Sequence, residues 1–287
     1  MAIEVVHEIG EVRKRVAAAR GRGSSIALVP TMGALHEGHL SLAKAARKDR
    51  KDGYVVMSIF VNPTQFGPGE DFARYPRDLA QDVQKAGSAG ADLVFAPPVE
   101  EMYDQDDATF VEVGGTLTKG LCAPFRPGHF RGVATVVAKL FNIVQPDRAY
   151  FGEKDYQQLQ IIKRMVRDLR MPVEVVAVPT VREADGLAMS SRNAHLSKEE
   201  RKAALVLNEA LMAAKKMAQR GDRDAQAIAA VIRRRLEGEA LVRLQYVEVC
   251  DAATLEPLER IQGRAVIALA AVVGKTRLID NVIVEGG

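Results

Sequence analysis

Five short segments in the first two thirds of this chain are almost continuously apolar, and they alternate with segments of helical periodicity. The apolar segments predict strands at 26–30, 54–60, 93–96, 148–151 and 173–178. The helical patterns lie at 37–50, 78–89, 129–145 and 155–169. A strand without a polar face is buried on both sides, which is typical of parallel sheets. The alternation therefore predicts an α/β fold, with a Rossmann-like parallel sheet and helices on both faces.

The pattern changes after about residue 182. Ser197 is a typical N-cap before an acidic first turn, and it starts the first of two long helical patterns, 198–219 and 223–237. Period-two strands are predicted at 244–249, 265–271 and 278–284. We expect two domains: a Rossmann-like domain over 1–182 and a smaller α+β domain over 183–287. The glycine-containing loop 185–193 lies near the predicted junction, where a mobile closure element is expected.

Composition excludes several classes of protein. Of the 287 residues 47% are apolar and 27% are charged, and the formal net charge is only +3, without a block of five or six like charges. A nucleic-acid partner is therefore not expected. Two cysteines are too few for a disulfide framework and indicate a reducing compartment. The longest apolar run, 265–273, is too short for a membrane span. We expect a cytoplasmic protein that does not enter the membrane.

The most informative motif is Pro-Thr-Met-Gly-Ala-Leu-His-Glu-Gly-His at 30–39, directly after the first predicted strand. His36 and His39 flank the start of the following helix, and Gly38 lies between them. A helix start offers main-chain N–H groups and a positive dipole end to phosphate, and a histidine can donate a hydrogen bond or a proton to it. This motif predicts a nucleotide site with chemistry at phosphorus.

A second motif, Asn-Pro-Thr-Gln-Phe at 62–66, follows the next strand and is expected at the same sheet edge. Gln65 is an uncharged donor and acceptor that can orient a small polar substrate, although an ordinary Asn-Pro turn explains the segment as well. The nearby polar residues either cover the site or hold a metal, and Asp78 is the candidate metal ligand by its location. They are Asp71, Arg74, Tyr75, Arg77 and Asp78.

Two further segments offer positive groups. Lys154, between a strand end and a helix start, can neutralise phosphate, and Gln158 follows one helical turn later. Met-Ser-Ser-Arg at 189–192 offers two hydroxyls and a guanidinium for a triphosphate and its departing pyrophosphate. In both places a solvated surface segment is the alternative. The chain contains no G-x-G-x-x-G sequence, which disfavours a dinucleotide-dependent oxidoreductase.

Taken together, these motifs resemble the signature of the pantothenate synthetase (pantoate–β-alanine ligase) family. The resemblance rests on 30–39 and 62–66, on Phe-Arg-Pro-Gly-His-Phe-Arg-Gly-Val at 125–133, on Gly-Glu-Lys-Asp at 152–155 and on 189–193. It spans essentially the whole chain, in order. The first motif is shared by a wider superfamily of HIGH-type nucleotidyltransferases and class I aminoacyl-tRNA synthetases.

The resemblance implies an ATP-dependent ligation in which pantoate first becomes pantoyl adenylate and β-alanine then displaces AMP. It also implies Mg²⁺ as the companion of ATP, and a homodimer. The implied catalytic residues are His39 as proton donor, with His36, Lys154 and Arg192, and the implied contacts of pantoate are Gln65 and Gln158, with Gln65 also near β-alanine. The implied ATP contacts are Met32, Gly33, Ala34, Leu35, His36, Glu37, Gly38, His39, Gly152, Glu153, Lys154, Asp155, Val181, Met189, Ser190, Ser191 and Arg192.

Two other functions stay open on the sequence alone. Another HIGH-type nucleotidyltransferase would keep the nucleotidyl group in its product, whereas the ligase ejects AMP. A non-catalytic nucleotide sensor or RNA-binding module could use the same fold. The absence of a basic stripe disfavours RNA, and Lys154 and Arg192 beside two histidines exceed what adenine binding alone requires.

Overall fold

The computed structural model describes residues 3–70 and 72–286, and these form two compact units. The first unit contains residues 3–113, 126–153 and 161–179, and the second contains 114–125, 154–160 and 180–286. Two pieces of the second unit, 114–125 and 154–160, come from the sequence range that we assigned to the first domain. The assignment of domains to 1–182 and 183–287 stays a prediction.

The first unit is built on a six-stranded sheet whose strands are all parallel, in the order β1-β4-β3-β2-β5-β6. The strands are β1 (Glu4–Val6), β2 (Ile26–Thr31), β3 (Tyr54–Ile59), β4 (Leu93–Phe95), β5 (Arg148–Gly152) and β6 (Glu174–Val178). Five of them match the predicted apolar segments to within one residue at either end. The predicted α/β class with a Rossmann-like sheet is confirmed.

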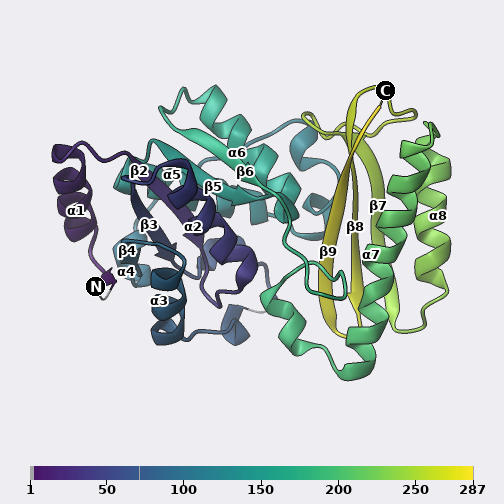
Figure 1. Ribbon diagram of the computed structural model, residues 1–287, viewed down its shortest axis with the longest axis horizontal. Coiled ribbons are helices and arrows are strands. Elements are labelled where there is room, and N and C mark those ends of the chain that lie inside the picture. Colours follow the sequence, from purple (N-terminus) through teal and green to yellow (C-terminus); the bar gives the residue numbers. More distant parts are fainter. Residues whose placement is uncertain (1–2, 71, 287) are drawn as a thin grey trace. The chain divides into compact units, whose positions relative to one another are not determined.

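The helices that connect these strands are α1 (Ile9–Gly21), α2 (Glu37–Asp49), α3 (Leu79–Ser88), α4 (Val99–Met102), α5 (His129–Val144) and α6 (Tyr156–Asp168). On one face of the sheet, α2 and α3 bury Leu40, Ala43 and Ala86 against Val29 and Met57. α1 packs against α5, and both contact β2. Figure 1 shows α2 close to β2 and β5, both of which it contacts.

The second unit has an antiparallel sheet of β7 (Val242–Asp251), β8 (Arg264–Val273) and β9 (Thr276–Glu285), in that order. Helices α7 (Lys198–Gln219) and α8 (Ala225–Glu237) cover one of its faces and share a buried core with it (Figure 1). Ser197 caps α7 in a reciprocal arrangement: its hydroxyl accepts from Glu200 N at 3.2 Å, and Ser197 N donates to the Glu200 carboxylate at 2.8 Å. The predicted start of this helix is confirmed.

β1 and α1 did not emerge from the sequence pattern. β1 has only three residues, and α1 buries only Val12, Val16 and Ala19 beneath a charged surface. Among the helices of the described chain, not one combines the length and apolar character that crossing a membrane requires.

Candidate active site

The turn after β2 is shaped by hydrogen bonds to polar side chains. Thr31 Oγ1 donates to Ser58 O at 2.7 Å and accepts from Gly33 N at 3.2 Å. Gly33 has a φ of 80°, and a Cβ atom there would lie 2.9 Å from Asp82 Oδ2. Both the backbone conformation and this close approach require glycine at position 33.

Asp82 of α3 is the second support of this turn. Its side chain accepts hydrogen bonds from Ala34 N at 2.8 Å and from Leu35 N at 2.7 Å, and the residue is only 2% exposed. Lys85, one turn later, donates to Leu35 O at 2.8 Å. Hydrogen bonds to a buried carboxylate are among the strong ones in proteins. Helix α3 thereby fixes the segment that leads into the two histidines.

His36 and His39 cap the start of α2. His36 Nδ1 accepts from Gly38 N at 3.1 Å, and His39 Nδ1 accepts from His36 N at 3.4 Å. Main-chain N–H groups can only donate, so both Nδ1 atoms accept, and each neutral ring carries its proton on Nε2. The ring centroids are 4.1 Å apart. The arrangement gives two adjacent imidazoles whose donor groups are on Nε2.

The main-chain N–H groups of Gly38, His39 and Leu40 at this helix start have partners within the turn. Besides the Gly38 N–H, His39 N donates to His36 O at 2.8 Å and Leu40 N donates to the same oxygen at 3.0 Å. We therefore expect the imidazoles and the helix dipole, rather than these N–H groups, to contribute most to phosphate binding here.

Gln65 is held in a fixed orientation at the end of the short helix Pro63–Gln65. Its Nε2 donates to Met32 Sδ at 2.9 Å, and its Oε1 accepts from Asn62 Nδ2 at 3.1 Å. The residue is 7% exposed. Tyr103 O–H donates to Asn62 Oδ1 at 2.9 Å and so holds Asn62 in turn. The structure thus joins Met32 and Gln65, two predicted site residues from different motifs.

The start of α5 supports Gln65 from its main-chain side. His129 Nδ1 donates to Gln65 O at 2.8 Å, and its Nε2 accepts from Arg126 at 2.8 Å. Arg126 also binds Glu70 through two nitrogens, at 2.8 and 2.6 Å. Burial alone would raise the pKa of Glu70, but the hydrogen bonds and charge of Arg126 outweigh it and hold that pKa below its usual value. The 125–133 motif therefore supports the main chain of Gln65, a role that could not be predicted from the sequence.

In the second unit, Lys154 and Gln158 lie at the start of α6. Lys154 Nζ is 3.9 Å from Asp155 Oδ2, and Gln158 is half-buried. The neighbouring Gln157 is buried, and its amide fixes the loop of residues 117–122 through Leu117 O, Gly120 O and Cys122 N at 2.8 to 3.0 Å. The two adjacent glutamines thus differ in role: the Gln157 amide bonds the main chain of a neighbouring loop, whereas Gln158 is the one predicted to contact substrate.

The Met-Ser-Ser-Arg loop has a hairpin at its base. Arg182 and Ala188 form an antiparallel bridge, and Met189 N donates to Val181 O at 3.0 Å. Ser190 Oγ accepts from Arg192 N at 3.3 Å and starts the short helix Ser191–His195. Two residues implied as ATP contacts from separate parts of the sequence, Val181 and Met189, are therefore direct neighbours.

Three members of the predicted polar cluster, Tyr75, Arg77 and Asp78, contact different neighbours. Tyr75 is buried against Phe66, and the Arg77 guanidinium lies 5.2 Å from the centre of the Phe72 ring. Asp71 lies outside the described residues. Asp78 is the N-cap of α3, where its Oδ1 accepts from Gln81 N at 3.0 Å.

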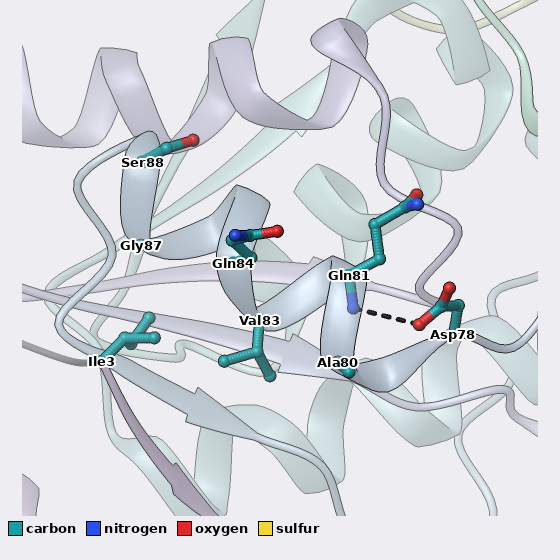
Figure 2. Close-up of a pocket in the computed structure, with 8 residues that line it drawn as sticks. All are labelled: Ile3, Asp78, Ala80, Gln81, Val83, Gln84, Gly87 and Ser88. Atoms are coloured by element: carbon teal, nitrogen blue, oxygen red, sulfur yellow. Dashed lines mark hydrogen bonds between the residues drawn. The ribbon is translucent and has the colours of Figure 1, made fainter.

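Asp78 also lines an open pocket of about 810 Å³ along α3, with Gln81, Gln84 and Ser88. Figure 2 shows Asp78 and Gln81 at one end of the pocket and Ser88 at the other. Within residues 3–70 and 72–286, no group of three acidic, histidine or cysteine side chains could hold a metal ion. Asp78 offers a single carboxylate, which would suit a Mg²⁺ ion held mainly by phosphate oxygens and water.

Comparison with known proteins identifies the family. The profile described as Pantoate-beta-alanine ligase matches residues 4–283. The chain belongs to the pantoate–β-alanine ligase family. A relative from Moorella thermoacetica, a pantothenate synthetase, is 61% identical in an alignment of 287 positions that covers 99% of each chain.

Solved structures of the family agree with this result. Pantothenate synthetase from Thermus thermophilus matches with a TM-score of 0.92 at 49% identity, over 98% of this chain and 99% of that one. The pantoate–β-alanine ligase of Francisella tularensis, solved in complex with β-γ ATP and β-alanine, matches with a TM-score of 0.79 at 33% identity over 98% of each chain. The resemblance found in the sequence is confirmed, and the chain is a ligase of pantoate and β-alanine. The individual site residues stay predictions.

Gly132 of α5 offers a test of how Gln65 is supported. A Cβ atom there would lie 2.3 Å from Thr64 O and 2.7 Å from Gln65 N. We expect Gly132→Ala to lower the free energy of unfolding by about 2–3 kcal/mol, because main chain must move, and to reduce ligase turnover in the fraction that stays folded. Urea unfolding and steady-state kinetics measure the two effects.

Gly10→Ala is the matched control, since Gly10 is also a helical glycine of the first unit but has nothing within 4 Å of the place that an added methyl group would take. This variant should be unchanged or more stable by about 0.4–1 kcal/mol. Equal stability of the two variants would contradict the close contact at Gly132.

Asp78→Asn separates a helix cap from a metal ligand. Asparagine caps helices as well as aspartate does, so the free energy of unfolding should change by less than about 0.5 kcal/mol. If the predicted metal role is correct, the Mg²⁺ concentration for half-maximal ligase activity should rise severalfold, because the carboxylate is lost. Asp78→Ala, the comparison variant, should show the same magnesium shift and lose about 1 kcal/mol of stability. An unchanged magnesium requirement in Asp78→Asn would leave Asp78 with the capping role alone.

Proposed function

We propose that this chain joins pantoate to β-alanine through a pantoyl-adenylate intermediate. In the first step the pantoate carboxylate attacks the α-phosphorus of ATP, and the bond to the departing pyrophosphate breaks. In the second step the amine of β-alanine attacks the acyl carbon, and AMP leaves with the bonding electrons. The imidazole pair at the start of α2, whose Nδ1 atoms accept hydrogen bonds from main-chain N–H groups, is the observation that supports this proposal most directly.

The first step brings an anion towards a polyanion, so donors must gather where negative charge grows. We assign this task to His39, whose Nε2–H donates to a phosphate oxygen, and to His36 beside it. The positive charges of Lys154 and Arg192 lower the repulsion and accept the charge of the leaving pyrophosphate. ATP contacts are proposed for 32–39, 152–155, Val181 and 189–192.

Pantoate must be held without a strong ion pair, because a paired carboxylate is a weaker nucleophile. Gln65 and Gln158 are neutral and fit this need. The Gln65 amide donates one hydrogen to Met32 Sδ and accepts one from Asn62. It retains a second N–H and a second lone pair for a substrate hydroxyl or carboxylate. We also assign Gln65 to β-alanine, whose amine has to approach the same acyl group.

Mg²⁺ would reach the site with ATP, with Asp78 as the proposed protein ligand, and would supply further charge neutralisation at the phosphates. The mixed anhydride of the adenylate is sensitive to water, so the site must exclude solvent until β-alanine has reacted. A homodimer is part of the proposal only through the family resemblance. The proposed location in the cytoplasm rests on the low cysteine content.

Isotope exchange tests the two-step scheme. Without β-alanine, the protein should transfer label from pyrophosphate into ATP only when pantoate is present, because the first step is reversible while the adenylate stays bound. The measurement is radioactivity recovered in ATP. The reaction without pantoate is the control. A folded protein that forms pantothenate from all three substrates without this exchange would contradict the adenylate intermediate.

His39→Ala tests the histidine assignment. Loss of a positioned acid typically slows a reaction by about 100- to 10,000-fold, and we expect a decrease of this size in the exchange rate. The fold should persist, since the bond that His39 Nδ1 accepts from His36 N is long, at 3.4 Å, and its loss costs little.

His7→Ala is the matched control. His7 is an exposed histidine of the same unit that donates to Ala96 O, and its loss should leave the exchange rate within about twofold of wild type. Near-normal exchange by His39→Ala would show that the proton donor lies elsewhere.

A further inference from the structure

β9 carries two adjacent buried polar residues, Asp280 and Asn281, inside the apolar run of residues 278–284. They are 3% and 5% exposed. Neighbouring side chains of a strand point to opposite faces of the sheet, so one residue lies on each face. Burying a polar group lowers the stability of the fold unless the group forms hydrogen bonds. The hydrogen-bond partners of these two residues identify the segments that they hold in place.

Asp280 shares its face with Leu278, Val282 and Val284, which belong to the core formed with α7 and α8. The two oxygens of Asp280 accept from the Arg182 guanidinium, at 2.7 Å to Oδ2 and 2.9 Å to Oδ1. This is a bidentate arrangement, in which two parallel hydrogen bonds fix the orientation of the arginine relative to the carboxylate. Asn281 N donates to Asp280 Oδ1 at 2.7 Å and fixes that carboxylate further.

Arg182 links Asp280 to the hairpin at the base of the Met-Ser-Ser-Arg loop. The same guanidinium donates to Gly186 O at 3.2 Å, at the turn of the hairpin. The hairpin then returns through the Arg182–Ala188 bridge to Met189, whose N–H bonds Val181 O. The Asp280 carboxylate is therefore one support of residues 182–186, beside Arg201, which binds the carboxylates of Glu183 and Asp185.

Asn281 acts on the opposite face of the sheet. Its Nδ2 donates to Lys154 O at 2.9 Å, at the point where β5 has ended and α6 is about to begin. The next residues of this segment are attached to the same unit, since Tyr156 O–H donates to Ala252 O at 2.9 Å. Asn281 thus holds the main chain of Lys154 while leaving its ammonium group to act elsewhere.

We infer that Asp280 and Asn281 are positioning residues that set the Lys154 segment and the 181–192 loop at a fixed geometry to one another. Consecutive residues of one strand hold the two segments from opposite faces, so neither segment can shift without disturbing the same few atoms of β9. The inference rests on the proposed function, which assigns both segments to ATP. Neither residue contacts substrate in this account.

A double-mutant cycle tests this arrangement. The probe is α,β-methylene-ATP with Mg²⁺, and isothermal titration calorimetry measures its Kd for wild type, Asn281→Ala, Lys154→Ala and the double variant. Loss of one well-placed hydrogen bond corresponds to about a tenfold rise in Kd for Asn281→Ala. In the Lys154→Ala background the same change should raise Kd by less than about twofold, because the group that Asn281 positions is absent.

Val284→Ala is the control for a merely structural effect. Val284 is a buried residue of the same strand and face as Asp280, and its truncation should lower the thermal midpoint without changing the Kd of the probe. If Asn281→Ala does not fold, Arg182→Lys tests the other half of the arrangement. It keeps the charge but loses the bidentate geometry, and it should raise Kd about threefold or more.

The inference is overturned if Asn281→Ala, or Arg182→Lys in its place, binds the probe like wild type. It is also overturned if the effect of Asn281→Ala is the same with and without Lys154, or if Val284→Ala weakens binding equally. These outcomes are independent of the reaction scheme. A wild-type protein that binds the probe but fails the pyrophosphate exchange would reject the adenylate mechanism and leave the positioning of the two segments to be judged by the cycle.

Discussion

The buried carboxylate of Asp82, bonded to the main-chain N–H groups of Ala34 and Leu35, is the interaction on which the first half of the site depends. In a parallel sheet the carboxyl ends of the strands lie at one edge, but this arrangement does not determine the path of the turn that follows each strand. Hydrophobic burial is non-directional, so it cannot determine this path either. The Asp82 side chain, which is 2% exposed, can determine the path of the turn. Any other path would leave its oxygens without hydrogen-bond partners in a place that water does not reach.

The same principle recurs at the other turns. His129 donates to Gln65 O, Gln157 bonds the loop of residues 117–122, and Arg182 joins its hairpin to Asp280. In each case a side chain with defined donor directions binds main-chain atoms or a carboxylate of a neighbouring segment. At these three places the residue that fixes the loop is not one of those proposed to touch substrate. Gln65, which is proposed to contact substrate, is itself held by Asn62 and His129, which have no proposed role in the reaction.

Much of the fold follows from periodicity in the sequence. The continuous apolar runs gave five of the six parallel strands because burial on both faces leaves a pattern that no helix surface shares. β1 and α1 were missed, since three residues are too few for a pattern and the charged surface of α1 hides Val12, Val16 and Ala19. The candidate site residues were recognisable because glycine, histidine and lysine follow strand ends at positions where chemistry is concentrated.

The supporting residues could not be found in this way, and the reason is physical. Asp82 has the same sequence appearance as any exposed acid on an amphipathic helix, and only its partners 47 and 48 positions away along the chain give it a role. Asp280 and Asn281 did leave a signal, since two polar residues interrupt an apolar strand and one of them must face a core. That signal indicates a buried hydrogen bond but not its partner. Candidate catalytic residues can thus be proposed from local sequence, whereas the residues that would orient them are defined by contacts across long sequence separations. A substitution of such a supporting residue moves a different side chain, the one that it holds in place. The resulting loss of activity therefore depends on how the fold is packed around the substituted residue, and not on the chemistry of the reaction.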